Sequence, residues 1–332
     1  MQPRNAILKK FDILRSRKHK NSKFLFLLRG IARLLTPGWI TRKRLKTVLG
    51  SINEYDSAYI EGRVLYYNQL QRQFVTGDNA SVFSQLSFKK RSAYYFDFQE
   101  CIRYFDPALQ FHYVFGDVID VPSVPSFVKS RPIAGDNVKS ILLKLNKVRH
   151  FTFVNDALPF QEKKDKLVWR GKAGVVGRVD FVREHFHNPL FDIGQTNTPE
   201  RDGNPLWQKG FMSIADQLQY KYILSIEGFD VASNLKWILS SNSLCFMKKP
   251  IYETWFMEGK LLPGVHYVQL KDDYSDIEEK VRYFTQHPDE SFEIIKQANL
   301  YCEQFKDTRR ETLISLLVMQ KYFEQSGQLT TA

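Results

Sequence analysis

The stretch that decides the fold is Tyr220–Leu244, which reads YKYILSIEGFDVASNLKWILSSNSL. Its first seven residues are apolar, aromatic or β-branched apart from a lysine and a serine, which is typical of a strand. A turn around Gly228 follows, and apolar residues then recur at helical spacing from Leu235 to Leu239. The stretch therefore predicts a strand, a turn and a helix. In α/β sheets this is where ligands usually bind.

Polar side chains gather where this strand is expected to end. Backbone N–H groups at the start of a helix are unpaired and favour anions, so the turn is a candidate pocket for a phosphorylated and hydroxylated ligand. An ordinary turn with a solvated loop is the alternative. The polar residues of the turn are Glu227, Asp230, Ser233, Asn234 and Lys236.

Alternation of strands and helices continues on both sides of this stretch, from Lys166 onward. It favours an α/β fold with a parallel, doubly wound sheet in the second half of the chain. The first half mixes patterns: 91–96 looks like a strand and 139–144 like a helix. With 332 residues, 43% of them hydrophobic, the chain is long enough for two domains.

Positive charge is concentrated at the N-terminus. Residues 1–46 hold 14 of the 48 Lys and Arg but one of the 36 acidic residues. This segment therefore carries a charge of +13, and the remainder of the chain is near neutral. The apolar run Phe24–Leu28 is too short for a signal peptide or a membrane span. With Ile31 and Leu34 it predicts an amphipathic helix on an anionic membrane surface. A tail packed on its own domain and a nucleic-acid-binding tail are the alternatives.

A second candidate anion site follows the predicted strand 167–169. Arg170, Gly171 and Lys172 occupy its exit, and Arg178 is close in sequence. Arginine suits phosphate oxygens, and glycine lets the backbone approach a ligand closely. The chain has no GxxxxGK[ST] loop and no GxGxxG after a strand, so ATP or NAD bound through those loops is not supported. It also has no Asp-x-Asp triplet, so positive side chains rather than a metal are expected to meet a diphosphate.

Two carboxylates are candidates for acid–base chemistry. Asp117 and Asp120 flank the start of a proline-marked loop, which continues as Val-Pro-Ser-Val-Pro to residue 125. A carboxylate on such a fixed loop is placed to take a proton from a hydroxyl nucleophile. Capping of the turn is the alternative role for either residue.

The ordered set of these motifs resembles glycosyltransferase family 90, which includes protein O-glucosyltransferases and bacterial lipopolysaccharide core glycosyltransferases. The resemblance covers roughly residues 110–305. Its segments are Asp120-Val-Pro-Ser-Val-Pro125 with Phe127-Val-Lys-Ser130, Trp169-Arg-Gly171, Lys221–Gly228 with Ser233–Leu239, and Pro263–Lys271 with Ser275-Asp276.

The resemblance implies a GT-B-like fold of two Rossmann-like domains facing a cleft, preceded by the basic helical segment. The expected divisions are the basic segment 1–46, an acceptor-side α/β domain 47–160, a nucleotide-sugar domain 161–305 and a C-terminal helix 306–332. It also implies a UDP-sugar donor, no metal or other cofactor, and inversion at the anomeric carbon.

The resemblance assigns the catalytic base to Asp120, with Asp117 as its rival. The implied donor-binding residues are Arg170, Gly171, Lys172, Arg178, Glu227, Gly228, Ser233, Asn234 and Lys236. Some relatives have arginine where Asn234 stands, so phosphate contact would pass to Arg178, Lys236 or Lys172.

The acceptor expected is the lipid A–core oligosaccharide of lipopolysaccharide. The absence of a signal peptide, the three well-separated cysteines and the basic N-terminal segment favour the bacterial branch. The enzyme would then work on the cytoplasmic face of the inner membrane, held at an anionic surface through residues 1–46, with no nucleic-acid partner. A transferase acting on capsule or other glycans, a phosphotransferase and a non-enzymatic protein binding anionic lipid or lipopolysaccharide are the alternatives.

Overall fold

The structure is a computed structural model that describes residues 19–88, 91–174, 177–198 and 204–330. It is a mixed α/β protein whose chain forms two compact units. Unit 1 comprises the described residues of 19–21, 151–250 and 260–303, and unit 2 those of 22–150, 251–259 and 304–330. Of the basic segment expected at 1–46, residues 1–18 lie outside the described residues.

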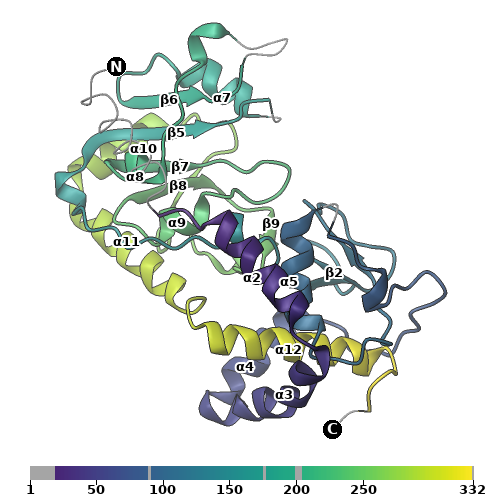
Figure 1. The fold of residues 1–332 in the computed structure, drawn as a ribbon. Helices are drawn as coiled ribbons and strands as arrows, with labels where there is room; N and C mark the ends of the chain where they lie inside the picture. Colours follow the sequence, from purple (N-terminus) through teal and green to yellow (C-terminus); the bar gives the residue numbers. More distant parts are fainter. Residues whose placement is uncertain (1–18, 89–90, 175–176, 199–203, 331–332) are drawn as a thin grey trace, which may run out of the picture. The chain divides into compact units, whose positions relative to one another are not determined.

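Unit 1 is built on a parallel five-stranded sheet of order β10-β8-β7-β5-β6 (Figure 1). Counted along the chain from β5, this is the order 2-1-3-4-5 of a doubly wound sheet. The elements are η3 (Phe160–Glu162), β5 (Lys164–Gly171), α7 (Arg178–His185), β6 (Phe191–Gln195), η4 (Pro205–Trp207), α8 (Ile214–Gln217), β7 (Tyr220–Ser225), α9 (Leu235–Leu239), β8 (Leu244–Lys248), β10 (Val268–Leu270), α10 (Ile277–Gln286) and α11 (Pro288–Glu303).

The strands of unit 1 are apolar because both faces of the sheet are covered. Side chains such as Leu167, Tyr222 and Phe246 point to one face and form a single core with α7 and α10. Alternate residues point to the opposite face, where α9 lies against β7 and β8 and α11 lies against α9 and β8. The sequence prediction of a parallel sheet in this half is confirmed.

Unit 2 holds a small parallel sheet of order β1-β2-β4 and an antiparallel pair, β3 with β9. These strands are β1 (Tyr113–Val114), β2 (Ser126–Val128), β3 (Ser130–Pro132), β4 (Ser140–Leu142) and β9 (Tyr252–Thr254). The helices are α2 (Lys23–Leu35), α3 (Gly38–Gly50), η1 (Ser51–Glu54), α4 (Ser57–Tyr67), η2 (Phe83–Gln85), α5 (Ser92–Ile102), α6 (Lys147–His150), η5 (Glu258–Lys260, ending in unit 1) and α12 (Thr308–Gln325).

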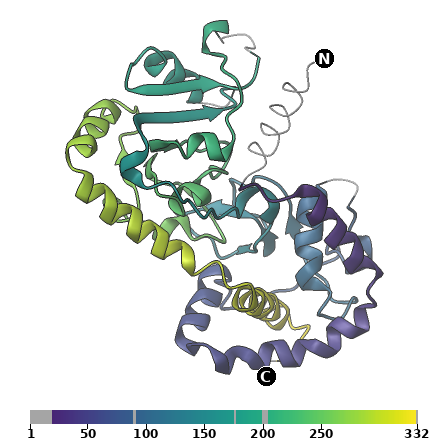
Figure 2. The same ribbon diagram turned by 60° about the vertical axis from the view of Figure 1, so that its left-hand side comes forward.

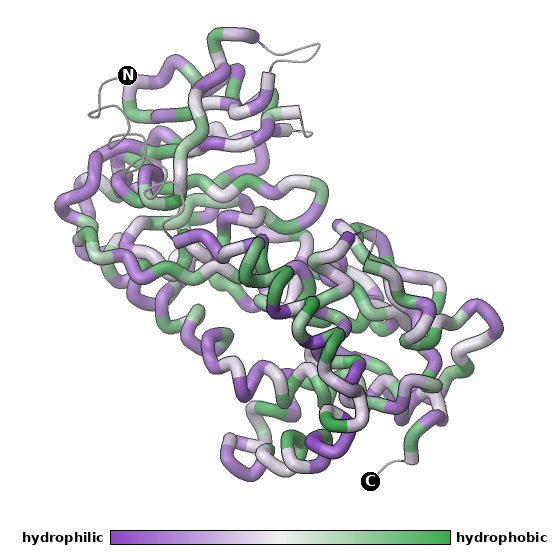
Figure 3. Tube along the Cα trace, in the orientation of Figure 1, coloured by the Kyte–Doolittle hydropathy of each residue, from purple (hydrophilic) through white to green (hydrophobic). Residues whose placement is uncertain are grey.

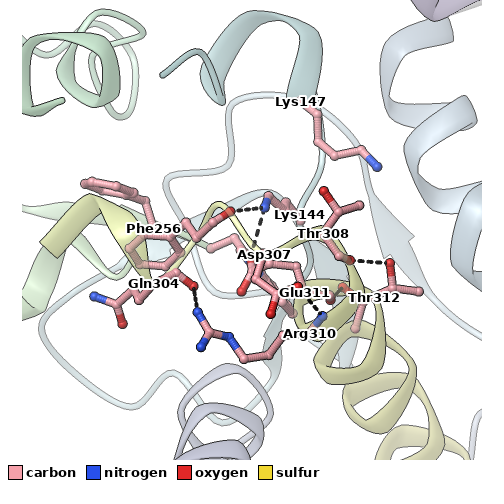
Figure 4. A network of polar contacts seen from close by, with 12 residues as sticks. Lys144, Lys147, Phe256, Gln304, Asp307, Thr308, Arg310, Glu311 and Thr312 are labelled. Atoms are coloured by element: carbon pink, nitrogen blue, oxygen red, sulfur yellow. Dashed lines mark hydrogen bonds and ion pairs between the residues drawn. The ribbon is translucent and has the colours of Figure 1, made fainter. Parts of the chain in front are cut away.

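The C-terminal helix α12 is the centre of the helical part of unit 2. It packs against α3, α4 and α5, and Figure 2 shows it nearly end-on beside the first two. Glu311 at its start is 4% exposed and accepts a hydrogen bond from Lys144 at 2.9 Å (Figure 4). It also accepts hydrogen bonds from Arg63 at 2.9 Å and from Trp255 at 2.6 Å. Two cations and an indole thus share one buried carboxylate, which ties α4, α12 and the segments around residues 144 and 255 together.

Two secondary-structure predictions are wrong. The expected strand at 91–96 is the start of α5, whose aromatic residues are buried on nearly all sides, so its pattern has no helical period to reveal it. The expected helix at 139–144 is β4 and its flanks, because Ile141 and Leu142 form a short buried parallel strand whose apolar run reads equally well as a helix.

Candidate functional site

The carboxyl ends of β5 and β7 form the ligand edge of unit 1. Strand β5 continues through α7 to β6 on one side, whereas β7 continues through α9 to β8 on the other. The two exit loops therefore diverge between these neighbouring strands. In open α/β sheets ligands bind at this switch point. It lies between Gly171 and Ser225, where the sequence placed its two candidate anion sites.

The exit of β5 combines a closely packed glycine with an exposed lysine. A Cβ atom on Gly171 would come within 2.6 Å of the Trp169 ring, so only glycine fits without moving the tryptophan. The next side chain, Lys172, is exposed. The first turn of α7 follows, preceded by Gly177 with a left-handed φ of 81° and without a side-chain cap. Uncapped N–H groups and a nearby ammonium are suited to an anion.

Arg178 joins the two exit loops. Its guanidinium donates to the carbonyl oxygens of Lys172 at 3.2 Å, Ile226 at 2.7 Å and Glu227 at 3.0 Å. A Cβ atom on Gly228 would lie 3.4 Å from the same guanidinium. Arg178 therefore holds the loops after β5 and β7 in one arrangement and brings a positive charge to the switch point.

Arg170 lies in a different environment from Arg178. Its side chain is 7% exposed and donates to Asp192, at 2.6 Å to both the carboxylate and the backbone oxygen. Lys209 at 2.9 Å and the Tyr220 hydroxyl at 2.6 Å donate to the same carboxylate. Burial alone would raise the pKa of Asp192, but the hydrogen bonds from these three partners outweigh it and hold that pKa below its ordinary value. Arg170 thus has a counter-ion inside unit 1.

The turn after β7 spans residues 226–234, and α9 begins where the helical spacing begins in the sequence. Gly228 N–H donates to the carbonyl of Asp230 at 3.0 Å, and α9 begins only at Leu235. Phe229 at the tip is 69% exposed. A helix that begins at residue 235 starts seven residues after Gly228, so the glycine turn itself contains no helix N-terminus.

Two of the expected ligand residues in this turn contact the protein instead. Asn234 donates to the carbonyl of Leu224 and accepts from the Ser225 hydroxyl, both at 3.1 Å. Lys236 is fully buried in α9, with its ammonium 5.7 Å from the centre of the Phe151 ring. Asn234 therefore holds the turn to the end of β7, whereas Lys236 lies in the interior beside Phe151. Glu227, Gly228 and Ser233 are half-buried beside them.

In unit 2, Asp117 follows β1 and forms an ion pair with Lys129. The ammonium is 2.6 Å from the carboxylate, and the two side chains are 1% and 30% exposed respectively. The Tyr94 hydroxyl lies 3.5 Å away. Burial raises the pKa of Asp117, but the hydrogen bond and positive charge of Lys129 outweigh this, so the net shift is downward. Asp117 is therefore ionised but already paired.

Asp120 is exposed on a loop that hydrogen bonds hold in place on both sides of it. Val118 before it exchanges hydrogen bonds with the Ser130 hydroxyl, both at 3.1 Å. Beyond it, Lys139 donates to the carbonyl of Ser123 at 2.8 Å, and Tyr322 donates to that of Pro125 at 3.0 Å. Asp120 itself is exposed, and within the described residues its carboxylate has no hydrogen bond or ion pair. The loop thus presents a carboxylate that is free to bind a hydroxyl.

The structure brings the candidates together in two groups. Gly171, Lys172, Arg178, Glu227 and Gly228 meet at the switch point of unit 1. Asp117 and Asp120 share one loop of unit 2.

Sequence reasoning missed Lys129 and Asp192, the partners of Asp117 and Arg170. The local signal for Lys129 was a lysine directly after the apolar residues Phe127 and Val128. Asp192 lies 22 residues from Arg170 and meets it only through the pairing of β5 with β6.

A cavity of about 400 Å³ in unit 1 lies away from this edge. Asp156, Leu158, Ala215 and Gln219 are among its lining residues. They precede β5 and β7, so the cavity lies at the amino ends of the strands, opposite to the end where such sheets bind ligands. It therefore takes no part in the candidate site.

The parallel sheet of unit 1, with strand order 2-1-3-4-5, defines a doubly wound, Rossmann-like α/β fold. The sequence model described as "Glycosyl transferase family 90" matches residues 126–322. The chain belongs to glycosyl transferase family 90, and the resemblance inferred from its motifs is confirmed.

The relatives differ in how much of their length is matched. The chain is 45% identical over 297 residues to the "O-glucosyltransferase LpsA" of Dichelobacter nodosus, covering 87% of this chain and 91% of that protein. It is 30% identical over 178 residues to "Protein O-glucosyltransferase 2" of Danio rerio, covering 52% of this chain and 34% of that protein. It is 28% identical over 206 residues to "Protein O-glucosyltransferase 3" of Rattus norvegicus, covering 56% of this chain and 40% of that protein.

Proposed function

We propose that this glycosyltransferase moves a hexose, glucose or galactose, from a UDP-sugar to a sugar hydroxyl of the lipopolysaccharide or lipooligosaccharide core. The observation that carries the proposal is the match to LpsA over 91% of that protein's length. The name of that relative supports glucosyl transfer, and lipopolysaccharide as the acceptor class follows from the resemblance to the bacterial branch of the family. The protein O-glucosyltransferases are matched over much smaller shares, 34% and 40%, so they support the chemistry more than the acceptor.

The donor is assigned to unit 1. Lys172 and Arg178 at the switch point supply positive charge for a diphosphate, and Gly171 allows the backbone to approach it. The first turn of α7 adds uncapped N–H groups. In the part of the chain that the structure describes, no cluster of three or more His, Cys, Asp or Glu side chains is arranged to hold a metal ion. We propose that Lys172 and Arg178, rather than a metal ion, neutralise the diphosphate.

The reaction is assigned to a carboxylate of unit 2, as in a GT-B arrangement with the donor on one unit and the acceptor on the other. Asp120 removes the proton of the acceptor hydroxyl, and the oxygen attacks the anomeric carbon in line. The bond from that carbon to the UDP oxygen breaks, and its electron pair leaves with UDP. In-line attack inverts the anomeric configuration. Asp117 remains the rival base, but its carboxylate is already paired with Lys129.

The location follows from the acceptor. A lipid A–core acceptor is membrane-bound, so we place the enzyme at the cytoplasmic face of the inner membrane.

Thermal unfolding with added nucleotide tests the donor class. The full chain should be stabilised by UDP in the presence of EDTA, and a screen of UDP-sugars against truncated core oligosaccharide should then identify one hexose that is transferred. Stabilisation by Mg-ATP but not by UDP would replace the proposal with a phosphotransferase. Stabilisation by neither nucleotide, together with binding of lipopolysaccharide, would favour a non-enzymatic binding protein.

A further inference from the structure

Helix α2 is fastened to unit 2 by one of its faces. Gly30 lies against the Phe96 ring of α5, so closely that a Cβ atom would come within 2.5 Å of it. Phe26 contacts the same ring edge-to-face at 6.3 Å. Arg33 forms an ion pair with Glu100 at 2.6 Å. The helix is therefore an ordered part of unit 2 with a defined inner face.

The opposite face of α2 is apolar and exposed. Phe24, Leu28, Ile31 and Leu35 repeat at helical spacing and point away from the side that carries Gly30. Figure 3 shows α2 as a mainly hydrophobic stretch. The exposed apolar side chains of this surface are Phe24 (72%), Leu25 (49%), Leu27 (38%), Leu28 (51%), Ile31 (51%), Leu34 (40%), Leu35 (81%), Trp39 (53%) and Ile40 (36%). We call this set the α2 surface.

Positive charge accompanies the α2 surface. Residues 22–46 of unit 2 contain seven Lys and Arg, of which Arg33 is paired with Glu100, and no Asp or Glu. The Lys43 ammonium lies 4.9 Å from the centre of the Trp39 ring at the start of α3, which keeps a cation beside the apolar set. Exposed apolar side chains rimmed by cations are the composition of a segment that lies in the boundary of an anionic bilayer.

The geometry fits a helix lying on a membrane. Within the described part of the chain, no single helix has the length and apolar composition of a membrane span, and α2 with α3–η1 does so only as a pair bent by 102°. The 13 residues of α2 rise about 20 Å. A tryptophan at the bend, as Trp39 is, suits the level of the lipid headgroups.

We propose that the α2 surface docks on an anionic phospholipid bilayer, with its apolar side chains in the outer part of the acyl region and its cations among the headgroups. This proposal is independent of the transfer reaction. It sharpens the expectation for residues 1–46, because the surface it names lies in α2 and the start of α3. It also gives unit 2, which carries Asp120, a fixed face toward the membrane.

Sedimentation with vesicles tests the proposal on the full chain without any substrate. Vesicles of phosphatidylcholine with phosphatidylglycerol are compared with vesicles of phosphatidylcholine alone. We expect binding to the anionic vesicles only, weakening as salt rises. Removing two rim cations with Lys23→Gln and Arg29→Gln should weaken binding about fivefold for each cation. Equal binding of this pair variant and the parent chain would overturn the electrostatic part of the proposal.

An apolar variant and a matched control test the α2 surface itself. The triple variant Leu28→Gln, Ile31→Gln and Leu35→Gln should weaken vesicle binding by at least about tenfold. The control places glutamine at three exposed apolar positions elsewhere, Leu65, Val75 and Leu300. It should bind vesicles as the parent chain does.

Unchanged binding of the triple variant would overturn the proposal, as would failure of the parent chain to bind anionic vesicles. Concentration-dependent dimers that the triple variant lacks, in a chain that binds no vesicles, would assign the α2 surface to a second copy. Transfer to a soluble truncated core oligosaccharide should be the same in all variants, so a failure of docking and a failure of the proposed function are distinguished.

Discussion

Asp120 and Asp117 share one loop, but replacing each with asparagine should have different consequences. We expect a loss of activity for Asp120→Asn and a loss of stability for Asp117→Asn. Asp120→Asn keeps the side-chain shape but removes the proposed base. We expect kcat to fall about 10²- to 10⁴-fold. Asp120 is exposed and its carboxylate has no polar partner among the described residues. The free energy of unfolding should therefore change by no more than about 0.5 kcal/mol.

Asp117→Asn should mainly affect stability. It leaves the ammonium of Lys129, which is 1% exposed, without the carboxylate that lies 2.6 Å away. Breaking a fully buried ion pair costs about 3–5 kcal/mol. Water can reach this pair, because the Asp117 side chain is 30% exposed. We therefore expect a loss of about 1–3 kcal/mol, or roughly 2–4 °C in Tm for each kcal/mol.

The pH dependence of the Asp117 effect gives a further check. The pKa of Asp117 lies below its ordinary value of 3.8 in the folded protein, because Lys129 outweighs the effect of burial. A group with a lowered pKa stabilises the fold above its ordinary pKa, and that contribution is lost as pH falls through the lower folded value. The stability difference between the parent chain and Asp117→Asn should be complete at neutral pH and should shrink below about pH 4.

Initial rates of transfer and thermal unfolding of both variants decide between the carboxylates. A large loss of kcat in Asp117→Asn, with near-normal kcat in Asp120→Asn, would transfer the base to Asp117. Near-full activity of both variants would refute the carboxylate mechanism. A large loss of Tm in Asp120→Asn would contradict the description of the loop.

Two other positions give matched comparisons. In Arg178→Lys the lysine cannot reach all three carbonyl oxygens of the exit loops, so KM for the donor should rise about tenfold. The control is Arg183→Lys. Arg183 is an exposed residue of α7 paired with Asp180, and its replacement should leave KM unchanged. Glu311→Gln leaves the buried Arg63 and the partly buried Lys144 without their carboxylate and should lower the free energy of unfolding by about 3–5 kcal/mol. Glu54→Gln, from an exposed ion pair with Arg309, should cost less than about 1 kcal/mol in a chemical-denaturation measurement, and an equal loss in both would contradict the buried network.

The central βα unit could be predicted because its signal is local. The apolar run of β7 and the helical spacing of α9 are both present in the sequence, and the structure confirms them. The contacts that hold the turn between them could not be predicted. Asn234 fixes that turn through the hydroxyl of Ser225 and the carbonyl of Leu224, and such side-chain contacts have no fixed spacing in a sequence.

The role of each charged candidate depends on contacts that a sequence does not contain. Arg170 and Arg178 are equivalent in the sequence as cations near a strand exit. Strand pairing brings Asp192 to Arg170, whereas the start of α7 directs Arg178 to the carbonyl oxygens of two loops. In the same way, the fold pairs Asp117 with Lys129 and leaves the carboxylate of Asp120 to the solvent.

The most direct test of the account is transfer by the purified full chain in the presence of EDTA. UDP-glucose and UDP-galactose are supplied in turn with truncated core oligosaccharide, and the product is analysed by mass spectrometry and by NMR of the new anomeric centre. The account predicts one added hexose, release of UDP and an anomeric configuration opposite to that of the donor. Transfer that stops when metal is chelated, or a product that retains the donor's configuration, would contradict it.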